Sequence, residues 1–122
     1  MPPILGIGIA GALGALARYG LGRAMAGLSS GFPWGTFTVN MLGCLAIAVV
    51  GAIALRYAGV APLLRLEVMT GFIGAFTTFS TFCLETLELA RSNLPQALAY
   101  LSGSTAVGLV AVWIGARLGG GI

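Results

Sequence analysis

A run of hydroxyl side chains lies inside an otherwise apolar stretch, in the segment GFIGAFTTFSTF that begins at residue 71. The hydroxyls alternate with phenylalanine rings and follow two glycines: Thr77, Thr78, Ser80 and Thr81, with Phe76, Phe79 and Phe82 between them. Lipid offers no hydrogen bonds, so polar side chains at membrane depth must be buried in protein or line a wet path. The pattern therefore predicts a pore or a binding site at this segment.

The amino-acid composition indicates which class of protein contains this segment. The chain has 122 residues, of which 58% are hydrophobic and only 7% are charged, and its mean hydropathy is +1.03. Soluble domains carry about 25% charged residues, so we predict an integral membrane protein that contacts the lipid bilayer. The charge consists of six scattered arginines and three glutamates, and a net +3 distributed in this way is no nucleic-acid footprint.

Four apolar stretches have the roughly 20 residues that are needed to cross a bilayer. They cover residues 4–24, 34–55, 66–89 and 95–117, and they are separated by breaks at 29–33, 56–65 and 91–93. Asn93 or Ser92 can cap the fourth helix, with Pro95 in its first turn. No linker is long enough to separate a second domain. We therefore predict an all-α membrane protein in which residues 1–122 form a single four-span transmembrane domain.

The arginines are distributed evenly between the two membrane surfaces that this topology creates. Three lie on the side of the N-terminus, the second loop and the C-terminus, and three lie on the other side: Arg56, Arg65 and Arg117 against Arg18, Arg23 and Arg91. The positive-inside rule then states no preference. Such a chain could insert in both orientations and form antiparallel pairs. The alternative is that Arg18 lies inside the bundle and should not be counted.

Small residues at helical spacing provide the close contacts that a small bundle needs. Gly8 and Ala12 are one of several such pairs in the first span, and Gly43 and Gly51 lie on one face of the second. Small residues let membrane helices approach closely, within one subunit or between two. Four helices cannot enclose a roomy aqueous route, so a pore would need a partner subunit.

Polar stripes are expected on three of the helices. Thr36 and Asn40 lie four residues apart in the second span, as do Tyr100 and Ser104 in the fourth. In the third span, Thr78, Thr81, Glu85 and Glu88 share one sector of the helix. Ser and Thr hydroxyls can also bond back to their own helix, and Glu85 can extend to the interface, so each stripe has a purely structural alternative. Arg18 can likewise be an interfacial anchor or an electropositive vestibule residue.

Catalytic chemistry has little support in this sequence. It contains no histidine and no aspartate, and Cys44 and Cys83 are single thiols in apolar helices, where packing is the ordinary role. We therefore expect no enzyme. The remaining classes are an ion channel, a small four-span multidrug or guanidinium exporter, and a membrane scaffold protein. The exporter class needs a carboxylate in its first helix, and residues 4–24 contain none.

Three segments resemble the CrcB/Fluc family of fluoride channels: GALGALARY at 11–19, WGTFTVNMLG at 34–43 and GFIGAFTTFSTF at 71–82. The resemblance implies an antiparallel, dual-topology homodimer of four-helix subunits in the cell (plasma or inner) membrane. It implies a third helix broken near residues 74–78, with a structural sodium ion at the subunit interface. The implied activity is passive, fluoride-selective export from the cytoplasm down the electrochemical gradient, which confers fluoride resistance.

The resemblance also implies a role for individual residues. Backbone carbonyls of Gly74 and Thr77 would bind sodium. The fluoride path would be formed by Asn40, Phe79, Phe82, Ser80, Thr81, Tyr100 and Ser104, and the vestibule by Arg18, Thr36 and Glu85. The chain has Ala75 where the family often has a second glycine, and Cys83 where it often has a polar residue. The positive edges of phenylalanine rings could contact an anion while excluding water, which agrees with these roles.

Overall fold

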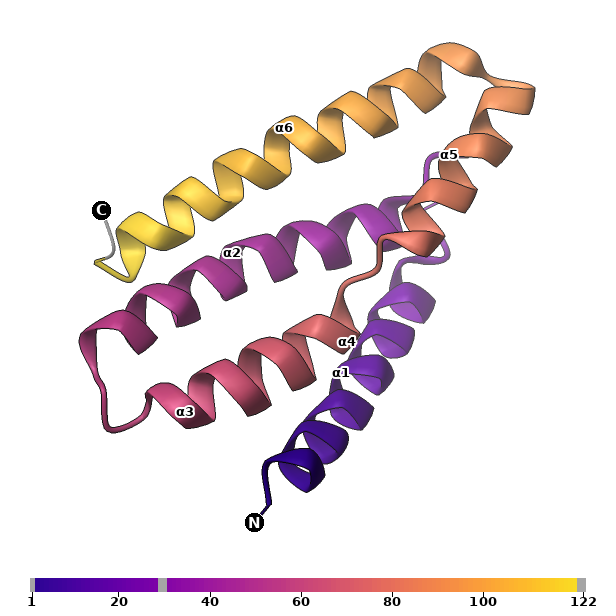
Figure 1. The fold of residues 1–122 in the computed structure, drawn as a ribbon. Coiled ribbons are helices and arrows are strands. Elements are labelled where there is room, and N and C mark those ends of the chain that lie inside the picture. The colour runs from indigo at the N-terminus through magenta and orange to yellow at the C-terminus, as the bar shows by residue number, and fades with distance from the viewer. Residues whose placement is uncertain (1, 29–30, 121–122) are drawn as a thin grey trace.

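The computed structural model describes residues 2–28 and 31–120, which are helical apart from turns and loops (Figure 1). Four stretches of these residues are long and apolar enough to cross a membrane: α1 (Pro3–Met25), α2 (Trp34–Arg56), the composite Ala61–Ser92 and α6 (Leu94–Leu118). The predicted four-span architecture is confirmed, and the ends of the first, second and fourth spans lie within one residue of the predicted ones. The first predicted break includes Ser29 and Ser30, which lie outside the described residues.

The third span is assembled from four helical pieces. It begins with α3 (Ala61–Leu63), continues as the π-helix η1 (Leu64–Ile73) and the single turn α4 (Gly74–Phe76), and resumes as α5 (Ser80–Ser92). Residues 77–79 are not helical, and Thr77 is extended with ψ of 160°. The predicted break at 74–78 is thus correct in its second half and wrong at Gly74, whose φ of −59° and ψ of −37° are helical. The π-helix was not predicted.

Close helix pairs hold the spans together. α2 and α6 run side by side (Figure 1), and a Cβ on Gly115 of α6 would collide with the Leu45 carbonyl of α2. On the other side of the fold, α1 packs along η1, where a Cβ on Gly14 would collide with the Phe72 carbonyl. Only glycine permits backbones to approach this closely, which is the packing that small residues provide in membranes.

An aromatic cluster joins α5 to α6. Tyr100 is completely buried, and its ring lies 4.9 Å from that of Phe82 at an interplanar angle of 68°. The turn between the two helices is capped by Asn93, whose side chain accepts a hydrogen bond of 3.1 Å from the Gln96 amide. The cap predicted for the fourth helix is therefore confirmed. The cluster and the cap fix the direction of α5 after the break.

Candidate functional site

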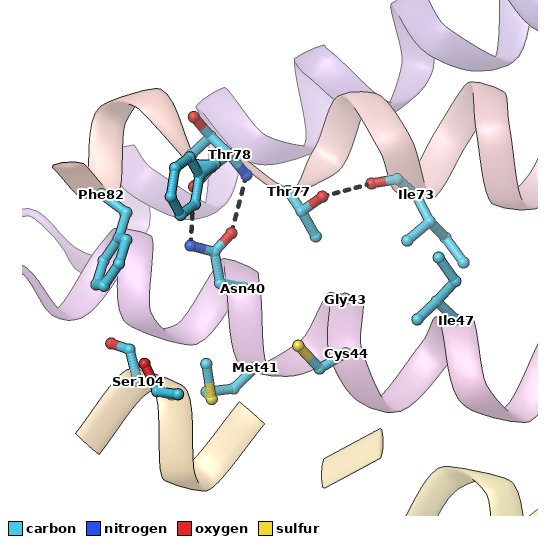
Figure 2. A pocket seen from close by; sticks show the side chains of 12 residues that line it. Asn40, Met41, Gly43, Cys44, Ile47, Ile73, Thr77, Thr78, Phe82 and Ser104 are labelled. Carbon is cyan, nitrogen blue, oxygen red and sulfur yellow. Dashed lines mark hydrogen bonds between the residues drawn. The ribbon is translucent and has the colours of Figure 1, made fainter. Parts of the chain in front are cut away.

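The break in the third span is fixed by one side chain of α2. The Asn40 side chain donates from Nδ2 to the Thr78 carbonyl at 3.0 Å and accepts from the Thr78 amide at 2.9 Å (Figure 2). These two bonds replace the ones that the backbone N–H and C=O of Thr78 would make in a continuous helix. A buried peptide group needs such partners, so the Asn40 amide stabilises the extended conformation at the break.

Two backbone carbonyls have lost their helical partners at the break. In an α-helix the Gly74 carbonyl would accept from the Thr78 amide, but that amide donates to Asn40. The Thr77 carbonyl would accept from the Thr81 amide, which donates to the Thr78 hydroxyl at 3.3 Å. The geometry therefore leaves these two carbonyls without the N–H groups of a continuous helix. Their oxygen atoms can therefore coordinate a cation or accept a hydrogen bond from another group.

A cavity of about 390 Å³ lies between the break, α2 and α6 (Figure 2). Its wall is apolar over most of its surface and carries a few amide, hydroxyl and thiol groups. The lining residues are Asn40, Met41, Gly43, Cys44, Ile47, Ile73, Thr77, Thr78, Phe79, Phe82, Ser104 and Thr105. The structure thus gathers Asn40, Thr77, Phe79, Phe82 and Ser104 of the predicted site around one space. Such a mostly apolar cavity with few polar groups is typical of a selective binding site.

Ser104 differs from the other hydroxyls of α6. Ser102 and Thr105 donate back to carbonyls of their own helix, to Leu98 at 2.6 Å and to Leu101 at 2.9 Å. The Ser104 hydroxyl oxygen is buried and has no hydrogen-bond partner among the described residues. Leaving a buried hydroxyl unpaired costs about 1–3 kcal/mol, so a molecule that enters the cavity and accepts or donates a hydrogen bond here would recover that cost.

The two phenylalanines predicted for the pore lie in different environments. Their ring centroids are 6.0 Å apart with an interplanar angle of 49°. Phe82 is buried against Tyr100, whereas Phe79 is 75% exposed although it lines the cavity. The edge of the cavity at Phe79 is therefore open in the single chain. An apolar ring exposed beside a cavity marks a surface that lipid or another protein covers.

A second cavity of about 130 Å³ lies on the other side of Thr78. Arg18, Thr36 and Thr81 line it, and the Nε atom of Arg18 is buried without a hydrogen-bond partner in the described part of the chain. The buried part of the Arg18 side chain therefore contributes to the wall of this cavity. Its guanidinium and the hydroxyls of this cavity form an electropositive, donor-rich space that is complementary to an anion.

Four predicted residues line neither cavity: Gly74, Ser80, Tyr100 and Glu85. The Tyr100 ring packs against Phe82, and the Tyr100 hydroxyl donates to the Glu85 carboxylate at 3.0 Å. Glu85 lines a third space of about 250 Å³ together with Glu88. Ser80 is exposed at the start of α5, and the described residues give it no contact with either cavity.

Part of the cavity wall was not predicted from the sequence. Met41, Cys44 and Thr105 line the larger cavity, and Thr78 lines both cavities. Spacing could have indicated Cys44, which follows Asn40 by one helical turn and so shares its face of α2. The role of Thr78 depends on a contact between residues 38 positions apart, which no local pattern contains.

Four apolar spans, a broken third span and donor-lined cavities at the break define a small multi-pass membrane protein of the channel or transporter class. Residues 5–116 match the family described as CrcB-like protein, Camphor Resistance (CrcB), and the chain belongs to this family. The resemblance seen in the sequence is thereby confirmed.

Curated relatives of the chain carry the name of an ion channel. "Fluoride-specific ion channel FluC" of Nitratidesulfovibrio vulgaris is 46% identical over 121 residues, 98% of each chain. The protein of the same name from Acidobacterium capsulatum is 43% identical over 94% of each chain. "Fluoride-specific ion channel FluC 2" of Symbiobacterium thermophilum is 45% identical over 93% of this chain and 94% of the relative. The chain is accordingly a multi-pass protein of the cell membrane and a transport protein, not an enzyme.

Proposed function

We propose that the chain is a fluoride-selective passive channel. It would let fluoride leave the cytoplasm down its electrochemical gradient and thereby confer fluoride resistance. The relatives named as fluoride-specific channels support the choice of ion, and they align with almost the whole chain. The observation that carries the proposal is the cavity lined by Phe79, Phe82 and Ser104, whose hydroxyl has no hydrogen-bond partner among the described residues.

This wall meets the requirements of a small anion. Fluoride is strongly hydrated, so a pore must replace lost water with hydrogen-bond donors and with positive ring edges. Ser104 supplies a donor that no protein group occupies. Phe79 and Phe82 supply ring edges and exclude water. Arg18 and the hydroxyls of the smaller cavity would attract the anion toward the break as a vestibule.

We also propose that the channel is an antiparallel homodimer. Phe79 borders the cavity and is 75% exposed, so a second subunit would complete the wall on that side. The equal numbers of arginines at the two surfaces agree with insertion in both orientations. A structural sodium ion at the interface would be held by the carbonyls of Gly74 and Thr77, since hard cations prefer oxygen ligands and both carbonyls have lost their helical donors.

The exporter alternative has no comparable support. The described first helix, Pro3–Met25, contains no acidic residue that could bind a cationic substrate or a proton. The two mechanisms also differ in their driving force: a passive channel needs only the fluoride gradient, whereas an exporter needs a proton gradient or nucleotide.

Fluoride efflux from liposomes that contain the pure protein tests the proposal. The expected result is rapid fluoride release without a proton gradient or nucleotide, while chloride is retained. Release that requires a proton gradient would support a transporter, and equal loss of chloride would identify a nonselective pore. Either outcome would refute the channel proposal.

A further inference from the structure

We propose that the neighbouring ends of α2 and α6 form a binding site for the phosphate of an anionic phospholipid, with Arg56 and Arg117 as its donors. Both arginines lie in the last turn of their helices, and the two helices end at the same side of the fold (Figure 1). The site is separate from the cavities at the break. It does not depend on which ion the protein conducts.

The Arg56 side chain extends from α2 to the turn that ends α6. Its Nη1 atom donates to the Gly119 carbonyl at 3.3 Å. In that turn, the Gly120 amide donates to the Arg117 carbonyl at 3.0 Å, and Gly120 has a φ of +80°. A Cβ at Gly120 would collide with the Arg56 guanidinium. Both the positive φ and the lack of space for a side chain therefore favour glycine at this position. The contact fixes Arg56 beside the end of α6, where Arg117 lies.

An aromatic ring orients each guanidinium. Arg56 lies over the Tyr57 ring at 5.6 Å from the centroid, and Arg117 lies over the Trp113 ring at 5.4 Å. A ring covers one face of the planar guanidinium and leaves the N–H groups in its plane free to donate, which is the geometry that phosphate oxygens accept. Trp and Tyr are also the residues that favour the headgroup level of a bilayer.

The charges at this end have no acidic partner in the described residues. Neither Arg56 nor Arg117 has a carboxylate within ion-pair distance there. On this side of the membrane the acidic side chain of the described residues is Glu67, which packs against Gly6 of α1. Two guanidiniums that have no carboxylate partner among the described residues, at the ends of two adjacent membrane helices, match an anionic headgroup.

The test compares lipid retention and thermal stability in nanodiscs of phosphatidylcholine alone and of phosphatidylcholine mixed with phosphatidylglycerol. Wild-type protein should retain phosphatidylglycerol in native mass spectrometry and should melt at a higher temperature in the mixed discs. The double variant Arg56→Gln, Arg117→Gln should bind this lipid roughly 30-fold more weakly, because each arginine near the surface contributes about 1 kcal/mol. Its gain in melting temperature should be lost.

The control is the double variant Arg23→Gln, Arg91→Gln, which removes the arginines in the last turns of α1 and α5 at the other membrane surface. It should retain phosphatidylglycerol like the wild type. The single variant Arg117→Gln breaks no hydrogen bond of the described structure and serves if the first double variant does not fold. Equal retention by all variants would overturn the proposal. So would an equal loss of stability in both kinds of disc, or a similar stabilisation by inorganic phosphate alone.

Discussion

Asn40 and Thr78 are 38 residues apart, and the side-chain amide of Asn40 binds both the backbone N–H and the backbone C=O of Thr78. The donor–acceptor distances are 3.0 and 2.9 Å. The Asn40 amide thus pairs the backbone N–H and C=O of Thr78, which have left the helical hydrogen-bond pattern. The break in the third span therefore depends on a tertiary contact, and the cavity beside it depends on the break.

Replacing Asn40 should affect stability and transport together. Asn40→Ala leaves the Thr78 amide and carbonyl without partners, which should cost about 1–3 kcal/mol for each group that stays dry. We expect a lower melting temperature and fluoride efflux that is slower by at least about tenfold, the factor that corresponds to 1.4 kcal/mol.

The control for this variant is Asn93→Ala, which removes the cap of α6 far from the cavity. It should lower the unfolding free energy by about 1 kcal/mol and leave efflux unchanged. An Asn40→Ala protein with wild-type efflux would show that the contact does not shape the ion path.

Two serines of α6 form a matched pair for testing the unpaired hydroxyl. Ser104→Ala removes a buried donor that has no protein partner, so folding should not suffer while efflux should fall by roughly tenfold. Ser102→Ala removes an exposed hydroxyl that donates to its own helix and should leave efflux unchanged. Efflux from liposomes and thermal melting measure the two effects. Equal efflux in both variants would assign Ser104 to packing.

The two phenylalanines should separate transport from folding. Phe79→Ile removes a ring that is 75% exposed, so the single chain should lose little stability. Phe82→Ile removes the ring that packs on Tyr100 and should cost about 1 kcal/mol or more. Both variants should slow fluoride efflux, because isoleucine has no positive ring edge.

Phe72→Ile is the control for these two variants. Its ring stacks on Phe76 at a centroid distance of 5.9 Å, and it lies outside both cavities at the break. Efflux should stay near the wild-type rate in this variant. If the double variant Phe79→Ile, Phe82→Ile also conducts at that rate, the rings are ordinary packing residues.

The bounds of the membrane spans could be predicted from the sequence more accurately than the position of the break in the third span. Hydropathy and the Asn93 cap placed three helices to within one residue, since membrane thickness and local capping act over short distances. Gly74 suggested that the break begins there, but Gly74 keeps a helical conformation. The non-helical residues begin at Thr77, where the Asn40 side chain binds the backbone amide of the next residue, Thr78. The exposure of Phe79 and the absence of a described partner for the Ser104 hydroxyl depend on how distant segments pack, so no local sequence pattern predicts them.

Glycines of α1 should differ sharply in their tolerance to alanine. A Cβ at Gly14 would lie about 3.0 Å from the Phe72 carbonyl carbon and closer still to its oxygen, so Gly14→Ala must push α1 away from η1. We expect a loss of about 1–3 kcal/mol in unfolding free energy. Gly8→Ala meets no atom within 4 Å and should be neutral in the single chain. Thermal melting of both variants in detergent checks this, and equal melting would contradict the packing of α1 on η1.

The proposed sodium site should depend on backbone rather than on side chains. Thr77→Val removes the hydroxyl that donates to the Ile73 carbonyl at 3.1 Å but keeps the extended peptide whose carbonyl would bind the ion. We therefore expect the Thr77→Val protein to keep its oligomeric mass in sodium and to lose it, like the wild type, when sodium is replaced by a large organic cation. Light scattering after size-exclusion chromatography measures this mass.

The variant Gly74→Ala complements Thr77→Val because it changes the other residue whose carbonyl would bind sodium. A Cβ at Gly74 would meet the Met69 carbonyl at an ordinary contact distance of 3.5 Å, so the single chain can accept alanine. Any loss of the dimer in this variant would then arise from a second backbone or an ion that approaches the exposed Gly74 surface. We expect the dimer to weaken while helix content and monomer melting stay unchanged. A Gly74→Ala protein that keeps a sodium-dependent dimer would place the ion elsewhere, and a dimer indifferent to sodium in the wild type would remove the site from the proposal.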